Sequence, residues 1–542
     1  MNLQLNPIDW TVLIAYLIVV AIIGLLAGRK IKGTESYFLG NRGFNRWLMI
    51  GQSFGIGTHA EMPVSLAGAV YSNGFSGIWF QWKNLFATPF FWLIAPLFRR
   101  MRRTTLGEVV EDRYGPWMGV FYTVFAIAFF TINMASMLKG AGKVISQATG
   151  GDVSANTIVV AMTVIFLLYS FIGGLVATAW TDFAQGFLII TLSFLLVPLG
   201  WGLVGGMDGM RQTLEPHFFS LATPSGIGVW FIFLLTVNGL IGIISQPHQL
   251  AAVGTGRDER TCRTGMFYGN FVKRICTVGW ALVGLIVAAL VLQPEHGFAP
   301  LKDPEDAFGL ACRHLLFPGG LGLMVASILA ANMSTCSAFM VDSGALFTKN
   351  LYQRFLKKSA SDQHYLWAGR VSGLVLSSMG VLYALFLVDR VLYSFLLTET
   401  MATYMGISIF GGILWRRATR WGALASLITP LVVNFSIMAA RGERLDHWEP
   451  NVFGISLLSG IAALILVSLL TKPEPGQMTE PFFARFEEPV EGTAKPGTRL
   501  LLADLATGLK KGGHYGEDIK GFLAGWGMVA ALVGLTWLFM RM

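Results

Sequence analysis

Long apolar runs recur along the whole chain, and short polar or charged segments separate them. About 20 consecutive apolar residues in a helix are enough to cross the hydrocarbon core of a bilayer. We therefore predict an all-α polytopic membrane protein with about fourteen transmembrane helices, at 8–28, 46–71, 75–98, 116–147, 155–175, 177–204, 227–252, 267–293, 318–346, 366–388, 391–414, 420–440, 451–471 and 521–540. The first run has no basic leader and no small-residue cleavage site, which predicts a retained helix and not a signal peptide.

Two of the predicted spans are interrupted by helix-weakening residues. The span 46–71 contains Gly51, Gly55, Gly57 and Pro63 around the polar patch Thr58-His59-Ala60-Glu61, and the span 227–252 contains Gly239, Gly242 and Pro247 around Asn238, Ser245, Gln246 and His248. Glycine and proline weaken the helical ladder and free backbone carbonyls. Broken spans at matching places in two halves are typical of a secondary transporter with inverted repeats. The alternative is that these glycines serve only close helix packing.

The order of the spans fits two inverted halves of five helices each. We expect an extra N-terminal helix and loop (1–45), a first repeat (46–205), a second repeat (227–414) and two further helices (420–471). A cytoplasmic segment (472–520) and a last helix (521–542) complete the chain. Within 472–520, residues 499–511 could form a short amphipathic helix on the membrane surface.

A pair of hydroxyl groups, Ser334 and Thr335, lies in the middle of the apolar span 318–346. Lipid offers a hydroxyl no hydrogen-bond partner, so these side chains should face the protein interior. They could bond back to carbonyls of their own helix. If the first broken span faces them instead, carbonyls of Gly55, Thr58 and Ala331 complete a cage of five neutral oxygens. Such a cage suits a monovalent alkali cation better than calcium, which usually recruits carboxylates.

Composition and charge agree with a membrane carrier. The chain is 54% hydrophobic and 13% charged, which excludes an ordinary soluble globule. Positive charge gathers in alternate loops, which we place in the cytoplasm; their basic residues are Arg29, Lys30, Lys32, Arg42, Arg46, Arg99, Arg100, Arg102, Arg103, Arg257, Arg260, Arg263, Lys349, Arg354, Lys357, Lys358, Arg416, Arg417 and Arg420. The intervening loops are acidic or mixed, with Asp208, Glu215, Glu295, Asp303, Glu305, Asp306, Glu443, Asp446 and Glu449. This asymmetry predicts a multi-pass protein of the cell membrane with both termini outside.

The net charge of +9 therefore reports topology, and we expect no nucleic-acid partner. The four cysteines indicate no disulfide framework, because three of them fall in spans or basic loops. No zinc-ligand spacing, phosphate loop or nucleophile elbow is present in the sequence, so we expect neither an enzyme nor an ATP-driven pump. No obligate protein partner is evident, and the expected partners are the lipid bilayer and a small polar solute.

Several motifs resemble signatures of the sodium/solute symporter family, which includes sodium–glucose, sodium–proline and sodium–sialic acid cotransporters. One is Ser170-Phe171-Ile172-Gly173-Gly174-Leu175-Val176-Ala177 with the following Trp180-Thr181-Asp182. The other runs from Gly322 to Thr335 and continues in Phe347-Thr348-Lys349-Asn350-Leu351-Tyr352. The resemblance covers nearly the whole chain. It implies a LeuT-type fold and a bound sodium ion, with Gly55, Thr58, Ala331, Ser334 and Thr335 at the matching positions.

The resemblance also bears on a second sodium and on the solute. Some members bind a second sodium through an aspartate and hydroxyls, for which Asp182, Ser334 and Ser337 match, although Ala338 replaces a further serine. For sugars, Gln81 and Asn84 beside Trp82 match polar positions, and Glu61 matches an acidic one. Met62 and Asn238 stand where a galactose carrier has a glutamine and a tyrosine, whereas Gln246-Pro247-His248 resembles a motif of proline transporters.

Glu61 and His59 leave several roles open. Glu61 could accept hydrogen bonds from a solute, bind a solute ammonium, or pair with a buried cation such as Lys83, Lys139 or Arg274. His59 and His248 could be buried hydrogen-bonding residues or could touch the solute. We predict a sodium-coupled symporter of a small polar organic solute (a sugar or polyol, an amino acid or a carboxylate). The alternatives are a proton-coupled carrier that uses Glu61 or His59, and a membrane sensor built on a transporter fold.

Overall fold

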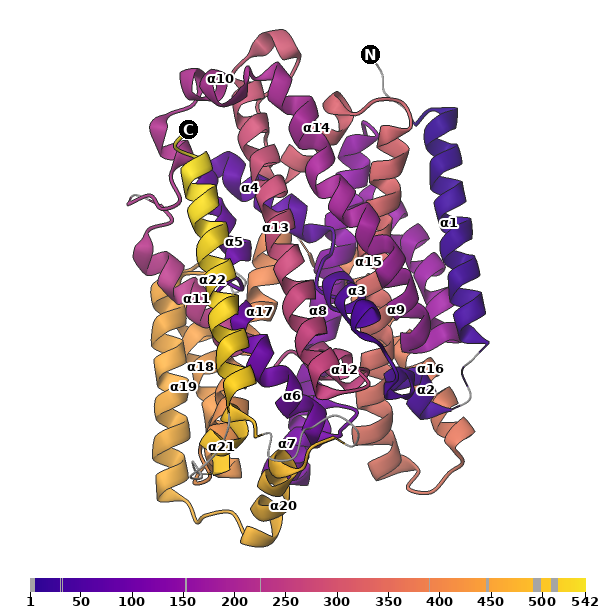
Figure 1. Ribbon diagram of the computed structural model, residues 1–542, viewed down its shortest axis with the longest axis vertical. Helices are drawn as coiled ribbons and strands as arrows, with labels where there is room; N and C mark the ends of the chain where they lie inside the picture. The colour runs from indigo at the N-terminus through magenta and orange to yellow at the C-terminus, as the bar shows by residue number, and fades with distance from the viewer. Residues whose placement is uncertain are drawn as a thin grey trace.

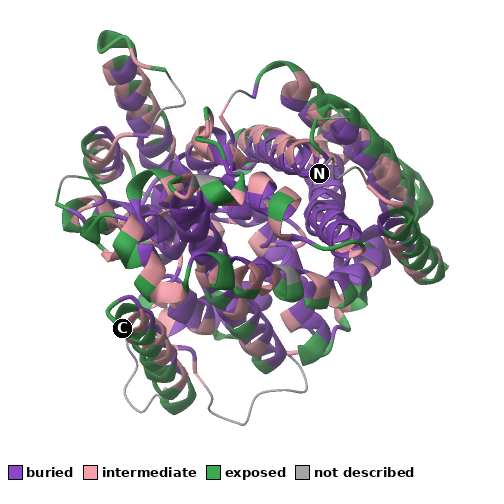
Figure 2. Ribbon diagram, turned by 90° about the horizontal axis from the view of Figure 1, so that it is seen from above, coloured by how far each residue is buried: buried purple, intermediate pink, exposed green. Residues whose placement is uncertain are grey.

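The computed structural model describes residues 5–29, 31, 33–151, 154–224, 226–388, 390–444, 448–490, 499–507 and 515–542. These residues form a bundle of helices that run mostly along one axis (Figure 1), with a single isolated β-bridge between Phe44 and Gly256. Seen from above, buried residues fill the centre of the bundle and exposed residues lie at its perimeter (Figure 2). Lys30, Lys32, Asp446 and positions 508–511 of the predicted amphipathic helix lie outside the described residues.

The first half of the chain contains two very long helices, the second of which is kinked, and several shorter ones. Its helices are α1 (Pro7–Gly28), α2 (Thr34–Leu39), α3 (Arg46–Gly55), α4 (Glu61–Asn73), α5 (Trp79–Trp82), α6 (Phe91–Met101), α7 (Leu106–Tyr114), α8 (Pro116–Ala148), α9 (Ala155–Leu203) and α10 (Gly206–Thr213). The predicted spans 155–175 and 177–204 are the two arms of α9, which breaks at Gly174 with φ of 52°. A Cβ there would lie 2.4 Å from the Tyr37 ring, so both the conformation and the space require glycine.

The second half repeats the alternation of broken and continuous helices. It contains α11 (Val229–Gly242), α12 (Pro247–Gly254), α13 (Glu259–Val291), α14 (Ala307–Leu315), α15 (Gly320–Leu346), α16 (Asp362–Phe386), α17 (Val391–Leu414), α18 (Arg420–Ala440), α19 (Pro450–Leu470), α20 (Gly476–Glu487), α21 (Leu501–Thr507) and α22 (Gly516–Phe539). A π-helical stretch, Phe347–Leu356, continues α15. The described part of the predicted amphipathic helix forms α21.

Among the described residues, nine helices are long and apolar enough to cross a membrane, or ten if the bent pair α11–α12 is one span. The predicted number of about fourteen spans also includes short or interrupted helices, such as α5 with α6. These helices are too short to be among the nine. Both chain ends lie at the same end of the bundle (Figure 1).

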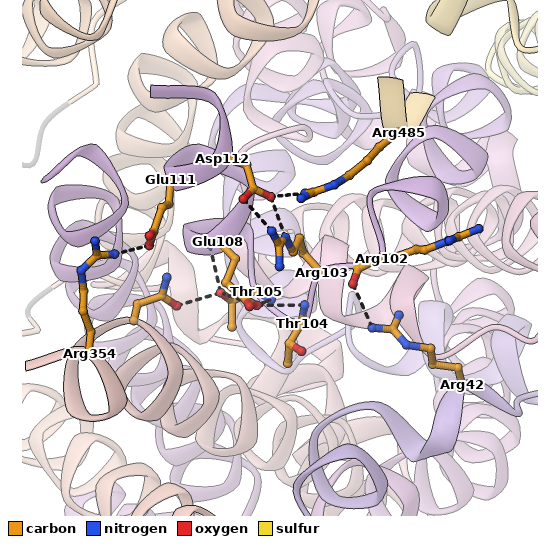
Figure 3. Close-up of polar contacts among 11 residues, drawn as sticks. Arg42, Arg102, Arg103, Thr104, Thr105, Glu108, Glu111, Asp112, Arg354 and Arg485 are labelled. Carbon is orange, nitrogen blue, oxygen red and sulfur yellow. Dashed lines mark hydrogen bonds and ion pairs between the residues drawn. The ribbon is translucent and has the colours of Figure 1, made fainter. Parts of the chain in front are cut away.

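Two polar networks tie helices together at opposite ends of the bundle. At the end opposite the termini, Asp112 of α7 accepts hydrogen bonds from Arg103 (both 2.6 Å) and contacts Arg485 of α20, while Glu111 pairs with Arg354 at 2.5 Å (Figure 3). The α20 helix thereby docks on α6 and α7, with Phe482, Phe483 and Phe486 buried.

At the other end, Lys143 of α8 pairs with Asp303 (3.1 Å) and Glu305 (2.5 Å), and Arg390 bonds Asp303 at 2.8 Å. Glu305 also accepts the backbone N–H of Leu392, at 2.9 Å, and so caps α17. These groups border an open cavity of about 350 Å³ whose wall includes Ser65, Gly68 and Ser72 of α4.

Candidate functional site

The first broken helix opens a stretch of free backbone in the core, as predicted. Helix α3 ends at Gly55 and α4 begins at Glu61, which leaves residues 56–60 between them. The side chain of Asn332 on α15 holds this stretch, because its Oδ1 accepts the Ala60 N–H at 2.9 Å. Asn332 in turn donates to the Met137 carbonyl of α8 at 2.6 Å. Sequence reasoning missed Asn332, although it lies between two of the residues singled out.

Four of the five residues predicted to bind sodium lie together, namely Gly55, Ala331, Ser334 and Thr335. The hydroxyl of Thr335 is 3.3 Å from the Gly55 carbonyl oxygen, 3.4 Å from that of Ile56 and 3.4 Å from that of Ala331. These distances exceed the usual 2.7–2.8 Å of a hydroxyl hydrogen bond, so the hydroxyl is not tightly bound to any one carbonyl. Ile56 was not predicted, and only the exact end of α3 identifies it.

Gly55 allows this approach. A Cβ at position 55 would lie 2.7 Å from the Asp182 Cβ and 3.1 Å from the Ser334 hydroxyl, so a larger residue would push α3 away from α9 and α15. Thr58 is fully buried in the break, but its hydroxyl donates to the Phe54 carbonyl of α3 at 2.6 Å. Thr58 and Ala331 share the wall of a small cavity of about 30 Å³.

Asp182 of α9 joins this cluster. Its Oδ1 accepts a hydrogen bond from Ser334, and its Oδ2 is buried with no hydrogen-bond partner in the described part of the chain. A buried carboxylate oxygen without a partner is costly, and a cation would satisfy it. Ser337, the other residue matched to a second sodium, donates to the Met333 carbonyl of its own helix at 2.5 Å.

The second broken helix faces α17. Helices α11 and α12 meet at an angle of 51°, and the Gln246 side chain just before α12 donates to Glu399 at 2.9 Å. Asn238 of α11 is fully buried; its side chain accepts from Thr403 at 2.7 Å and donates to Thr400 at 3.3 Å. Asn238 therefore joins α11 to α17, and its polar atoms are already occupied.

The structure gives partners to the intramembrane charges. The Glu61 carboxyl group contacts the His59 ring, and Lys83 of α5 pairs with Glu399 of α17 at 3.2 Å. Arg274 of α13 donates to the backbone carbonyl of Gln81 at 3.1 Å. The pairing of Glu61 with Lys83, Lys139 or Arg274, one of the roles left open, is therefore not what the structure contains. Lys139 bonds Asn156 at 3.3 Å.

Several of the residues matched to solute positions keep buried polar atoms unpaired. Both amide atoms of Gln81, the Oδ1 of Asn84 and the Oε2 of Glu61 lack hydrogen-bond partners within the described residues. Met62 is buried beside Glu61, and the His248 ring packs against Phe129 and Phe339. Buried polar groups are normally satisfied, so this set is suited to a polar ligand.

One further charged residue, Lys273 of α13, was missed. It is 5% exposed, and a Cβ at Gly57 would lie 2.7 Å from its Nζ. The adjacent pair Lys273-Arg274 is a charged interruption of an apolar span, and this was the signal available in the sequence.

Comparisons with known proteins agree with this architecture. The model of the sodium:solute symporter family matches residues 37–429. The osmoregulated proline transporter OpuE of Bacillus subtilis is 26% identical over 477 residues, which cover 84% of this chain and 94% of that protein. The sodium/proline symporter of Salmonella typhimurium is 27% identical over 493 residues, 86% of this chain and 94% of that protein.

A solved structure shows the fold. A Na⁺-coupled sialic acid symporter in a substrate-bound, outward-open state superposes with a TM-score of 0.72 and 20% identity, over 86% of this chain and 98% of that one. Its fold is the LeuT type, which the resemblance to the family implied for this chain. The length of the family match, together with this fold, identifies the chain as a member of the sodium:solute symporter family.

Proposed function

We propose that this protein couples the inward movement of sodium to the uptake of a small polar organic solute by alternating access. The observation that carries the proposal is the oxygen cluster around Thr335, which joins the break of α3–α4 to α15. Sodium would bind the carbonyls of Gly55 and Ala331 and the hydroxyls of Ser334 and Thr335. Thr58 belongs to the same proposed site by resemblance to the family.

Sodium at this site would fix the position of the broken helix. The residues on the α4 side of the break, His59, Glu61 and Met62, would then be held in one arrangement with Gln81 and Asn84, which we propose line the solute site together with Asn238. Coupling is a reciprocal free energy: sodium tightens solute binding by the same factor by which the solute tightens sodium binding. A second sodium beside Asp182 and Ser337 is supported by the unpaired Asp182 oxygen.

We further propose fourteen crossings with both termini outside. Pairing the short helices into broken spans supports this number, as does the position of both ends at one end of the bundle (Figure 1). Because the relatives from Bacillus subtilis and Salmonella typhimurium are named as proline transporters, L-proline is the first solute to test.

The test is a thermal-stability screen of the purified protein in sodium and in potassium buffer. The panel contains sugars, polyols, amino acids and carboxylates. A ligand present at about 100 times its Kd adds about 2.7 kcal/mol to the free energy of unfolding. We expect at least one solute to stabilise the protein in sodium only. Equal stabilisation in both buffers would refute sodium coupling.

A proton-coupled carrier is the second candidate, and the buried His59–Glu61 pair favours it. Histidine and glutamate are common members of proton relays in transporters. Solute uptake into liposomes driven by a pH gradient, in the absence of sodium, would support this alternative. Uptake that requires sodium at every pH would exclude it.

A further inference from the structure

Lys273 is a buried basic residue beside the broken helix, and its amino group has no partner among the residues that the structure describes. It makes no hydrogen bond and no ion pair with any described residue, and it is 5% exposed. Its Nζ lies against the backbone of Gly57, in the break between α3 and α4. Placing an ammonium in the interior without a counter-ion is costly, so this position requires an explanation.

The neighbouring charges do not neutralise it. The groups that act electrostatically on Lys273 are Arg274, Glu399, Glu61 and Lys83. Glu399 already pairs with Lys83, and Glu61 already pairs with His59. Lys273, Arg274 and Lys83 are therefore three basic groups beside two carboxyl groups, so the basic groups in this region outnumber the acidic ones.

Further unpaired hydrogen-bonding groups belong to Gln81, whose backbone contacts the helix that carries Lys273. Gln81 is fully buried, and neither of its amide atoms has a partner among the described residues. Its backbone carbonyl is bound by Arg274, the residue next to Lys273, so the helix that carries Lys273 also holds Gln81. A basic group and an amide donor without partners are the kinds of group that an anion would satisfy.

We propose that Lys273 binds a carboxylate group of the transported solute. This inference rests on the proposed symport function and specifies its substrate class. The ammonium of Lys273 supplies the charge, and the amide of Gln81 supplies a hydrogen bond. Neutral sugars and polyols carry no anionic group that could pair with Lys273, so the proposal predicts that they do not bind. The carboxylate can belong to a zwitterionic amino acid or to a simple monocarboxylate.

Pairs of compounds that differ only in the acid group test the proposal without any mutation. L-proline is compared with L-prolinamide, and propionate with propionamide; D-galactose is the neutral control. Solute affinity is measured from the concentration dependence of the thermal shift in sodium buffer. We expect at least one acid to bind at least about 30-fold more tightly than its amide, the lower range for loss of a buried charge pair. Whether proline or propionate binds identifies the source of the carboxylate.

The variant Lys273→Gln then tests the residue, with Lys302→Gln as the matched control. Lys302 is exposed in the outer loop, so its substitution removes the same charge outside the site. We expect Lys273→Gln to weaken binding of the preferred acid at least about 30-fold and to keep its stabilisation by sodium alone, which also shows that it folds. Lys302→Gln should keep both.

The outcomes separate this inference from the function on which it rests. Sodium-dependent binding of galactose or of the amides as tight as that of the acids would overturn the carboxylate assignment and leave symport intact. Unchanged acid affinity in Lys273→Gln would overturn the role of Lys273. If no solute of the wider panel of sugars, polyols, amino acids and carboxylates binds in sodium, the proposed function itself is refuted. Should Lys273→Gln fail to fold, the comparison of acids with amides still decides the substrate class.

Discussion

Replacement of Thr335 by alanine removes the hydroxyl at the centre of the proposed sodium site. In the structure this group lies 3.3 to 3.4 Å from three backbone carbonyl oxygens and is not tightly bound to any of them. Its loss should therefore leave the fold with little loss of hydrogen bonding, because the carbonyls of Ala331 and Gly55 also belong to helical or turn backbone. The main effect should be on the cation.

The size of the effect follows from the value of one contact to a charged group. Such a contact contributes about 1.5–3 kcal/mol, and about 2 kcal/mol corresponds to a 30-fold increase in the Kd for sodium. Sodium at about 100 times the wild-type Kd stabilises the protein by about 2.7 kcal/mol. The same concentration is then only about 3 times the Kd of the variant, so the stabilisation falls to about 0.9 kcal/mol.

The assay is the free energy of unfolding of the purified protein, or its Tm, over a series of sodium concentrations with potassium as the replacement ion. Thr335→Ser keeps the hydroxyl and should retain most of the sodium effect. Ser343→Ala is the matched control, because this buried hydroxyl on the same helix bonds only back to Met340, at 3.1 Å. Wild-type dependence on sodium in Thr335→Ala would refute the assignment of the site to Thr335.

Three further predictions concern the ion pairs. Glu399→Gln leaves Lys83 buried without its partner and should lower the free energy of unfolding by about 3–5 kcal/mol. The double variant Lys83→Met/Glu399→Leu should be nearly neutral. Thermal unfolding measures both variants, and equal losses of stability would contradict the pairing. Burial opposes ionisation of Asp303, but Lys143 and Arg390 hold its pKa below its ordinary value. The contribution of ionised Asp303 to the free energy of unfolding is therefore complete above the ordinary pKa of about 3.9. It is lost as the pH falls through the lower pKa that Asp303 has in the folded protein. Because the pair is partly exposed, Asp303→Asn should cost about 0.2–1 kcal/mol at pH 7, and the Tm difference from wild type should disappear only below about pH 4. Asp112→Asn should weaken the docking of α20, so limited proteolysis should cut residues 472–490 faster than in the wild type. An unchanged rate of cleavage would show that the buried phenylalanines alone hold α20 in place.

The sequence was sufficient for the fold because the LeuT-type signals are local. Gly55, Gly57 and Pro247 interrupt apolar helices, and this predicts where α3–α4 and α11–α12 break. The hydroxyls of Ser334 and Thr335 in an apolar helix indicate an interior face. Each of these inferences depends on a short window of residues, for which periodicity and propensity are informative.

The pairing of the charges could not be predicted in the same way. Lys83 and Glu399 are 316 positions apart, and their contact depends on how α5 and α17 pack. The partner of Glu61, by contrast, is only two residues away in the sequence. A regular helix does not place residues i and i+2 on one face, so only the break between α3 and α4 brings His59 to Glu61. The importance of Lys273 likewise follows from the absence of a partner, which requires the positions of all its neighbours.

The most direct test of sodium-coupled symport is the entry of radioactive sodium into liposomes that contain the purified protein. Sodium entry is measured with and without each solute of the panel outside, so the result does not depend on the net charge of the transported complex. The account predicts that one class of solute accelerates sodium entry and that Thr335→Ala abolishes the acceleration at low sodium. Solute uptake that proceeds with no accompanying sodium entry would contradict it.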